Sequence, residues 1–436
     1  MKKIISLILA LIMVVSVFYG CSNGSTESSP EDTENPDENV IKQELDIVIY
    51  DRENDSEYWN RVISAFEENN PGVKVNMFID KNAAYELRNR ILGGASPDFV
   101  FLPSDEESGV TTALIKDKAL VSLSDVSQTA KPLLFSGIFD NAISKPYDDE
   151  EIYLAPLFFD AKGMIYNKTL LSENGWTVPK TWDEFIELAE ECDKKKISIF
   201  SYAGAEPDEF TDIFASAVGS VVGTEKLAEM FDCNSEAWED ESVNTFAGYI
   251  EKIKKLVADG SSKKTKDDVV SSLKNGEALF ISGTLSDLSD FSDEESGSNE
   301  YGFAFYPVID IGNRINVIEF SEMYIPYEAE NPELAKKFMV FQYSDIAVNI
   351  AAETLGEAAP VLKASNSAES YGFDKNYSSV YSSMGNGNVF VPEFKIKAAE
   401  NETLEDEFCG LIISIFKGTV TAEDFSSKMS EYLENY

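Results

Sequence analysis

Residues 153–160 (YLAPLFFD), followed by 163–168 (GMIYNK) and 179–184 (PKTWDE), decide the fold of this 436-residue chain. The residues before Pro156 alternate in polarity and predict a strand that ends there, because proline has no N–H to continue a ladder. A new strand is expected to begin at Met164. We therefore predict that the chain leaves one lobe here and enters another.

A helix is expected directly after these strands. Thr181 and Glu184 form a capping-box pattern, in which a hydroxyl and a carboxylate satisfy free backbone N–H groups at a helix start. The apolar positions that follow recur at helical spacing, so one face of this helix is predicted to lie in a core. These positions are Phe185, Leu188, Ala189 and Cys192.

The ordered series Ala-Pro at 155–156, Tyr-Asn-Lys at 166–168 and Pro-Lys-Thr-Trp-Asp-Glu at 179–184 resembles the extracellular solute-binding proteins of ABC importers. That family includes maltose-binding protein. The segments 66–75 (FEENNPGVKV) and 94–98 (GASPD) resemble two further motifs of the same family. The resemblance implies an α/β, two-lobed periplasmic-binding-protein-like fold with a three-strand hinge, and a binding protein rather than an enzyme.

The resemblance also implies how the chain divides between the lobes. Each lobe is expected to be built from two separate parts of the sequence, so the chain passes between the lobes three times. The expected segments are a signal peptide (1–20), a disordered tether (21–43), the first (44–157) and second (307–356) parts of the N-terminal lobe, and the first (158–306) and second (357–436) parts of the C-terminal lobe.

The N-terminus reads as an export signal. Met1-Lys2-Lys3 precedes an uncharged apolar run at 4–17, and the Gly20-Cys21 junction resembles a lipoprotein signal in which Cys21 becomes a lipid-carrying N-terminus. Phe18 and Tyr19 depart from the usual residues of that signal, and an uncleaved anchor helix is the alternative. Both predict an exported protein attached to the outer face of the cell membrane.

Composition narrows the possible functions. The region from Ser22 to about Ile41 is rich in Ser, Glu, Asp, Asn and Pro and has no aromatic residue, so it predicts a flexible tether. A formal net charge of −42 excludes nucleic acid as a partner, because phosphate binding needs a basic surface. This charge indicates a solvated exterior, and the alternative is that it concentrates a cationic ligand.

Cysteine and histidine usage argues against metal and nucleophilic chemistry. The chain has no histidine, the commonest general base and metal ligand. Cys192, Cys233 and Cys409 have no CxxC spacing, so neither a disulfide framework nor a metal site is predicted, although a single pair among them remains open. No cofactor is expected. The acidic loop at 287–300 lacks the glycine placement of a calcium loop.

The rest of the chain predicts alternating strands and helices. An apolar run at 45–50 predicts the first strand, and a helix carrying Trp59 on its buried face is expected to start at a cap on Ser56. We expect the strand at 301–308 to return to the first lobe and residues 356–362 to make the third crossing. Further strands are expected at 73–77, 99–102, 197–202 and 278–282, and helices at 246–257, after Asn331-Pro332 and after a cap on Thr421.

The candidate ligand site lies at strand ends. The resemblance places Asp160 just after the Pro156 crossing and Asp105 on the opposite lobe, where each carboxylate would accept hydroxyls of a sugar and would be left unpaired by a wrong ligand. The alternative is that each caps a helix or pairs with a lysine. The remaining candidates adjoin predicted strand ends and comprise the aromatic residues Phe158, Phe159, Tyr202, Trp59 and Tyr324, and the polar residues Arg52 and Ser104.

Two departures from the family pattern weigh against a long oligosaccharide. Sugar binders of the family commonly carry tryptophan where this chain has Thr284-Leu285 and Leu102-Pro103. Trp176 and Trp182 belong to the structural motif and are expected in the core.

Together these features predict a lipid-anchored, monomeric receptor that delivers a small solute, first of all a carbohydrate, to the membrane subunits of an ABC importer. The alternatives are a polyamine or peptide ligand on the same fold, a secreted lipoprotein enzyme, and an adaptor that has lost its ligand. A lipid-anchored receptor needs neither a cofactor nor a metal.

Overall fold

The structure is a computed structural model. It describes residues 43–52, 55–102, 108–135, 137–291, 299–355, 359–360, 378, 380, 384, 388–394 and 404–435. The predicted signal peptide with Cys21, nearly all of the predicted tether, Ser104, Asp105 and most of the predicted third crossing lie outside these residues. Gln43, predicted as the end of the tether, instead begins the first strand, where its backbone N–H donates to the carbonyl oxygen of Gly72.

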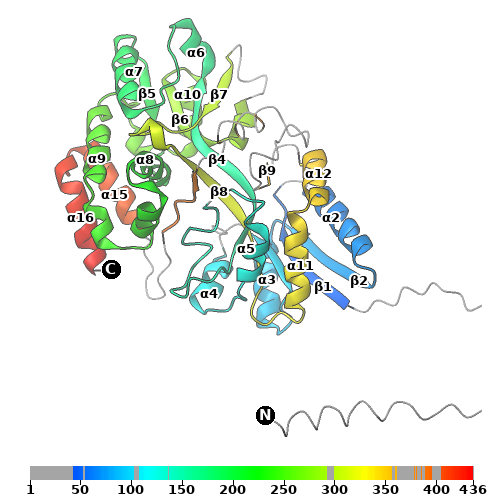
Figure 1. Ribbon diagram of the computed structural model, residues 1–436. Helices are drawn as coiled ribbons and strands as arrows, with labels where there is room; N and C mark the ends of the chain where they lie inside the picture. The colour runs from blue at the N-terminus through cyan, green and yellow to red at the C-terminus, as the bar shows by residue number, and fades with distance from the viewer. Residues whose placement is uncertain are drawn as a thin grey trace, which may run out of the picture. The chain divides into compact units, whose positions relative to one another are not determined.

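The described strands form one ten-stranded mixed sheet, shown in Figure 1. Its main path runs β2-β1-β3-β8-β4-β6-β5, with β10 paired to β8 and both β7 and β9 paired to β4. The first strands pair in parallel and the central ones antiparallel. The strands are β1 (Gln43–Tyr50), β2 (Val73–Asp80), β3 (Phe99–Leu102), β4 (Ala155–Asn167), β5 (Ser198–Ser201), β6 (Ala278–Thr284), β7 (Tyr301–Ala304), β8 (Ile315–Tyr324), β9 (Ala359–Pro360) and β10 (Asn388–Phe390).

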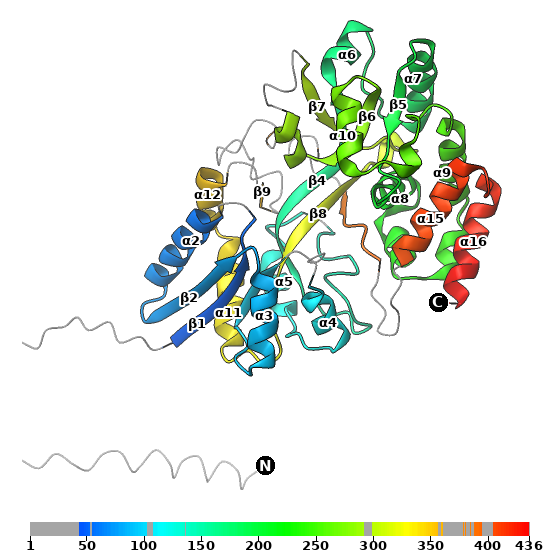
Figure 2. The same cartoon turned by 180° about the vertical axis from the view of Figure 1, so that it is seen from behind.

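The helices gather in two groups around this sheet, as Figures 1 and 2 show from opposite sides. One group lies beside β1 and β2, and the other surrounds β5, β6 and β7. The first group is α2 (Ser56–Asn69), α3 (Ala83–Leu92), α4 (Val110–Lys116), α5 (Ser124–Ala130), α11 (Pro332–Gln342) and α12 (Asp345–Thr354). The second is α6 (Lys168–Glu173), α7 (Trp182–Lys194), α8 (Glu209–Phe231), α9 (Glu241–Ile253), α10 (Lys266–Lys274), α15 (Leu404–Lys417) and α16 (Ala422–Asn435).

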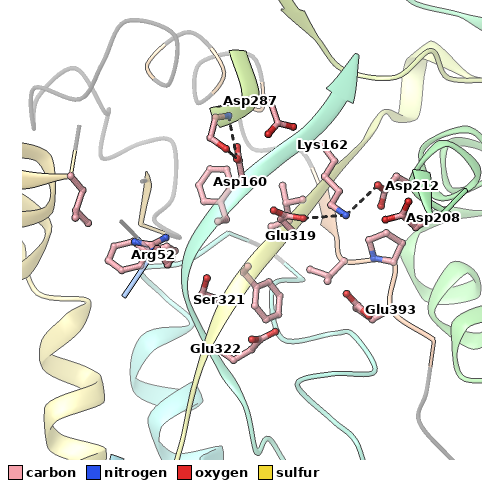
Figure 3. A pocket seen from close by; sticks show the side chains of 18 of the residues that line it. Arg52, Asp160, Lys162, Asp208, Asp212, Asp287, Glu319, Ser321, Glu322 and Glu393 are labelled. Carbon is pink, nitrogen blue, oxygen red and sulfur yellow. Dashed lines mark hydrogen bonds and ion pairs between the residues drawn. The ribbon is translucent and has the colours of Figure 1, made fainter. Parts of the chain in front are cut away.

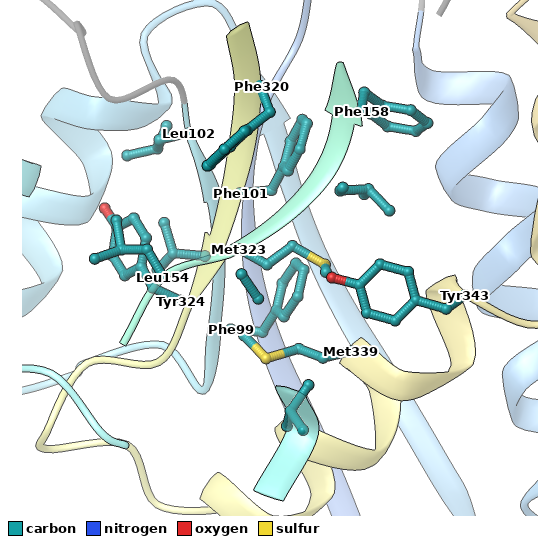
Figure 4. Packing of buried hydrophobic residues seen from close by; sticks show 14 of the residues in the cluster. Phe99, Phe101, Leu102, Leu154, Phe158, Phe320, Met323, Tyr324, Met339 and Tyr343 are labelled. Carbon is teal, nitrogen blue, oxygen red and sulfur yellow. The ribbon is translucent and has the colours of Figure 1, made fainter. Parts of the chain in front are cut away.

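Each group of helices encloses its own hydrophobic core. The first core packs β1, β3, α2 and α11, and Figure 4 shows its residues, among them Phe99, Phe101 and Met339. The second core packs α7, α8, α9, α15 and α16 around Trp238, which stacks on Phe214 with ring centroids 5.0 Å apart. A smaller third cluster lies around Leu273 and Ile281. Because most buried apolar surface falls in the two large, separate clusters, each group of elements is stabilised largely by its own burial.

Strand β4 joins the two cores and corrects the predicted strand break. It is continuous from Ala155 to Asn167, because Pro156 occupies only its second position, where the pairing with β8 shifts register before Phe158. A missing N–H is tolerated at the start of a strand or at a bulge. The first half of β4 pairs with β8 and the second half with β6 and β7.

Strand β8, rather than residues 301–308, returns the chain to the first core. The expected return strand was wrong, because β7 pairs with the C-terminal half of β4, where Ala304 lies opposite Met164. On β8, Ile315 belongs to the second core and Met323 to the first. Strand β9 makes a third antiparallel segment beside β4. Three adjacent strands, β9, β4 and β8, therefore run where the two cores meet.

Helix α7 matches its prediction closely. The hydroxyl oxygen of Thr181 accepts a hydrogen bond of 3.3 Å from the backbone N–H of Glu184, and the four predicted core positions are buried. The carboxylate of Glu184 accepts from the backbone N–H of Lys180 (2.7 Å) rather than from that of Thr181. The backbone N–H of Lys180, before the helix, and that of Glu184, in its first turn, thus both have acceptors. Trp182 is buried in the second core and Trp176 packs against it, as predicted.

Replacing Thr181 with alanine should lower the free energy of unfolding by about 1 kcal/mol, because the backbone N–H of Glu184 loses its acceptor. Urea denaturation measures this change. Thr177→Ala is the control, because Thr177 is exposed beside the same helix, and it should change stability by less than about 0.5 kcal/mol. Loss of ligand affinity with unchanged stability would mean that this loop contacts the ligand.

The cysteines do not form the pair that the sequence left open. Cys192 and Cys409 are buried free thiols, and the thiol of Cys233 donates a 3.8 Å hydrogen bond to the carbonyl oxygen of Phe231. Burial raises the pKa of Cys192 to about 12. Such a thiol stays protonated near neutral pH and acts as a small core residue.

Candidate functional site

A cavity of about 610 Å³ opens beside the central strands β4 and β8 (Figure 3). Elements from both groups contribute side chains to it. Arg52 follows β1 in the first group, whereas Asp212 lies on α8 and Ser286 follows β6 in the second. The volume suits a small ligand. The other lining residues are Asp55, Phe158, Phe159, Asp160, Lys162, Asp208, Asp287, Ser289, Asp290, Ile318, Glu319, Phe320, Ser321, Glu322, Leu355, Val391, Pro392, Glu393 and Glu405.

Asp160 lies on β4 and faces this cavity. One carboxylate oxygen accepts a hydrogen bond of 2.8 Å from the backbone N–H of Ala161. The other accepts from the backbone N–H of Ser286 at 3.2 Å and also from the Ser286 hydroxyl. Burial raises the pKa of Asp160 to about 6, while the Ser286 hydroxyl opposes this rise. Asp160 is therefore held in position by neutral donors.

Lys162 lies two residues further along the same strand and carries two ion pairs. Its ammonium nitrogen lies 3.2 Å from a carboxylate oxygen of Asp212 and 3.1 Å from one of Glu319, as Figure 3 shows. Burial by itself lowers the pKa of Lys162, but these carboxylates outweigh it and hold the pKa well above its ordinary value. Burial raises the pKa of Asp212 to about 7, against the effect of Lys162.

Arg52 occupies the side of the cavity nearest the first core. Its Nε donates a 2.7 Å hydrogen bond to the carboxylate of Asp55, and its guanidinium carbon lies 4.4 Å from the ring centroid of Phe158. A guanidinium over an aromatic face is attracted by the ring quadrupole. These two contacts fix the orientation of Arg52 before any ligand arrives.

Four of the predicted site residues line the cavity: Asp160, Arg52, Phe158 and Phe159. The two phenylalanines are nearly covered, with 1% and 3% of their surface exposed, so they form its wall and leave no open stacking platform.

The other three described candidates pack in the cores and are not among the described lining residues. Trp59 contacts Phe101 (ring centroids 5.1 Å apart), Tyr202 stacks on Phe416 (4.6 Å), and the Tyr324 hydroxyl bonds to that of Thr111 (2.9 Å). Ser104 and Asp105 lie outside the described residues.

Sequence reasoning missed most of the charged lining. Lys162 and Glu319 stand inside largely buried strands, and a charged residue in such a strand is an informative signal that went unused. Asp212 lies on α8, whose residues 209–220 are buried on every side. The sequence therefore gave no contrast between a buried and an exposed helix face that would have singled out Asp212. Glu405 precedes α15's apolar stretch and gave no local sign of facing the cavity.

The described residues contain neither a metal-binding cluster nor a membrane-spanning helix. No group of three or more acidic, cysteine or histidine side chains is placed to hold a metal ion there. No helix within the same residues combines the length and the apolar character needed to cross a bilayer.

Comparison with known proteins places the chain in a family. The model of the family described as bacterial extracellular solute-binding protein matches residues 50–348. The multiple sugar-binding protein of Streptococcus mutans is 26% identical over 238 residues, 51% of this chain and 49% of the relative. The diacetylchitobiose binding protein of Streptomyces coelicolor is 26% identical over 197 residues, 42% of this chain and 41% of the relative. The chain thus matches about half the length of these relatives or less.

A solved structure extends the likeness over nearly the whole chain. The family 1 extracellular solute-binding protein of Bifidobacterium longum subsp. infantis superposes with a TM-score of 0.67 at 18% identity, covering 90% of this chain and 99% of that one. At this identity the likeness concerns the fold, and it confirms the predicted two-lobed α/β architecture in which β4, β8 and β9 form a three-strand hinge. With more than half of its length matched by the family model, this chain belongs to the bacterial extracellular solute-binding proteins.

Proposed function

We propose that this protein captures a small carbohydrate outside the cell and delivers it to an ABC importer. The observation that carries the proposal is a polar cavity of about 610 Å³ beside the hinge strands of a solute-binding protein. The names of the two relatives, a multiple sugar-binding protein and a diacetylchitobiose binding protein, favour a sugar as the solute.

The lining chemistry suits a polyol. The carboxylates of Asp160 and Glu319 accept hydrogen bonds, the Ser321 hydroxyl both donates and accepts, and Arg52 donates. Sugar hydroxyls need both kinds of partner. A charged acceptor left unpaired by a wrong ligand is costly, so the same groups also give specificity.

The position of these residues also supports a closing motion. Asp160 lies on β4 and Glu319 on β8, the strands that pass between the two cores. A ligand that contacts both lobes at once stabilises the arrangement in which the lobes have closed on it. The importer would recognise this closed form. We keep the predicted lobes as part of this proposal, each built from two parts of the chain (44–157 with 307–356, and 158–306 with 357–436), but move the return to the first lobe from residue 307 to β8, where Ile315 lies in the second core and Met323 in the first.

Binding to sugars tests the proposed function. A panel of mono- and disaccharides is screened by thermal shift, and the hits are measured by isothermal titration. A true ligand at a hundredfold excess over its Kd should stabilise the protein by about 2.7 kcal/mol. Maltose, cellobiose, raffinose and diacetylchitobiose are suitable first probes. Stabilisation by no saccharide, or turnover of a saccharide, would overturn the proposal.

The proposal includes a lipid anchor on Cys21 and a monomeric receptor. Cys21→Ala should abolish incorporation of a fatty-acid probe, because the thioether-forming side chain is gone, and any of the variant that is cleaved should leave the membrane fraction. Metabolic labelling and fractionation measure both. Ser22→Ala is the matched control and should still be labelled. A labelled Cys21→Ala protein would exclude this residue as the attachment site.

A further inference from the structure

The described lining of the cavity is strongly acidic. It contains ten carboxylate side chains against two basic ones, Arg52 and Lys162. A neutral polyol needs a few acceptors, and it supplies no positive charge to balance the rest. Carboxylates enclosed by low-dielectric walls raise the local concentration of cations. The acid excess is therefore a property of the ligand site itself, beyond the acidity of the exterior.

Both basic residues are already engaged. Arg52 is paired with Asp55, and Lys162 bridges Asp212 and Glu319. Asp208 has a cation of its own outside the cavity lining, because its carboxylate lies 3.1 Å from the ammonium nitrogen of Lys266. What matters is a covered carboxylate without a cation.

Asp160 is such a carboxylate. Its bonds are with Ser286 and with a backbone N–H, and no lysine or arginine among the described residues forms an ion pair with it. Asp160 therefore lacks a counter-charge of its own.

A second feature points to the same place. Asp160 on β4 lies directly opposite Glu319 on β8 in the antiparallel register, and both line the cavity. Directly opposed side chains lie about 5 Å apart at Cβ, and like charges in such a pair destabilise the sheet. Glu319 has Lys162 as a partner, but Lys162 also serves Asp212. Asp160 and Glu319 thus form a like-charge pair in the hinge, and the nearby Lys162 does not neutralise both of them.

We propose that the solute is a saccharide with a protonated amino group, and that the ammonium binds between Asp160 and Glu319. This inference rests on the proposed function and names its ligand class. An ammonium has three donors and would bond to both carboxylates with charge-assisted hydrogen bonds. It would also supply the counter-charge that this strand pair lacks. The hydroxyls of the same ligand would use Ser289, Ser321 and Arg52.

The test compares ligands that differ only at one substituent. Chitobiose, diacetylchitobiose and cellobiose are β-1,4-linked disaccharides that carry ammonium, acetamido and hydroxyl groups at the same ring position. Glucosamine, N-acetylglucosamine and glucose, and the corresponding galactose series, extend the comparison to monosaccharides. Spermidine tests a cation without a sugar. In the series that binds, isothermal titration near pH 6.5 should show at least tenfold tighter binding of the amino sugar than of the acetamido and hydroxyl sugars. Added salt should weaken binding of the amino sugar and leave binding of the two neutral sugars unchanged.

Variants assign the effect to the two acids. Asp160→Asn keeps an acceptor for Ser286, and Glu319→Gln leaves Lys162 paired with Asp212. Each should lower the affinity for the amino sugar about tenfold more than that for its neutral counterpart, since one charge-assisted hydrogen bond becomes neutral. Glu330→Gln is the matched control, because Glu330 is exposed and is not among the described lining residues, and it should keep the full preference. A merely structural role would lower both affinities equally.

The outcomes separate the two proposals. An amino-sugar preference that Asp160→Asn and Glu319→Gln reduce supports the inference. Equal or tighter binding of the neutral sugars, or a preference that neither variant changes, overturns the inference and leaves the carbohydrate receptor intact. Binding of spermidine with no binding by any saccharide overturns the carbohydrate assignment and the amino sugar with it.

Discussion

Replacing Trp59 with alanine is expected to lower the free energy of unfolding by about 4 kcal/mol, as large aromatic truncations in cores do. Trp59 has no exposed surface and packs against Phe99, Phe101 and Tyr58. Removing the indole leaves a void that α2 and the sheet cannot close without losing other contacts. Urea denaturation followed by circular dichroism measures the loss.

Conservative and matched variants show whether Trp59 serves the core or the ligand. Its indole N–H has no hydrogen-bond partner among the described residues, so Trp59→Phe removes no polar contact and should cost clearly less than the alanine change. Trp176→Ala, at a half-buried tryptophan, should cost less than Trp59→Ala. Ligand affinity of Trp59→Phe should equal that of the wild type. A tenfold loss of affinity with little loss of stability would instead make Trp59 a ligand residue.

Local patterns allowed several helices to be predicted correctly. In α11, Asn331-Pro332 marks the predicted start, and the buried positions Leu334, Ala335, Phe338 and Met339 recur at helical spacing. Helix α7 is similar, because its cap and its apolar stripe lie within one short segment. Helix caps and apolar stripes depend on residues close together in the sequence, so they can be predicted from one sequence without knowledge of the tertiary fold.

The hinge and the site depend on contacts between distant residues, and the sequence predicted them less well. Nothing near Pro156 reveals that its missing N–H falls at a register shift with β8, so the continuous β4 was read as two strands. The pairing of Asp160 with Glu319 joins residues from separate parts of the chain. Residues 209–220 of helix α8 are buried on every side, so no exposed face set Asp212 apart, and it escaped notice.

Proximity to a strand end was a poor guide to which aromatic residues line the cavity. Trp59, Tyr202 and Tyr324 adjoin strands and crossings, yet the cores need large apolar side chains at those same places. Asp160 was chosen because the family resemblance places an acid just after the Pro156 crossing, and it does line the cavity. A charged residue in an apolar strand was the more informative signal, since burying it is costly without a purpose.

Replacing Lys162 with methionine is expected to lower the free energy of unfolding by about 3 kcal/mol near pH 8, because removal of one partner leaves a buried charge uncompensated. Asp212 is the charge in question, with only 9% of its side chain exposed. The side chain of Lys162 is 25% exposed, and water therefore weakens the pair. The expected loss of stability is for this reason at the low end of the range for broken buried ion pairs. The exposed pair between Lys266 and Asp208 gives the matched control, and Lys266→Met should change stability by less than about 0.5 kcal/mol.

The loss in Lys162→Met should shrink as the pH falls. Burial already raises the pKa of Asp212 to about 7, and removing the lysine raises it further. A carboxyl whose pKa is raised on folding binds protons more tightly in the folded state, so its cost to stability grows as pH rises above the unfolded pKa and is relieved at low pH. Near pH 5.5 Asp212 is protonated and neutral, and little charge remains uncompensated. Adding Asp212→Asn to Lys162→Met should restore at least half of the loss at pH 8. An equal loss at both pH values, or no recovery in the double variant, would show that Lys162 acts through packing of its alkyl chain rather than through its charge.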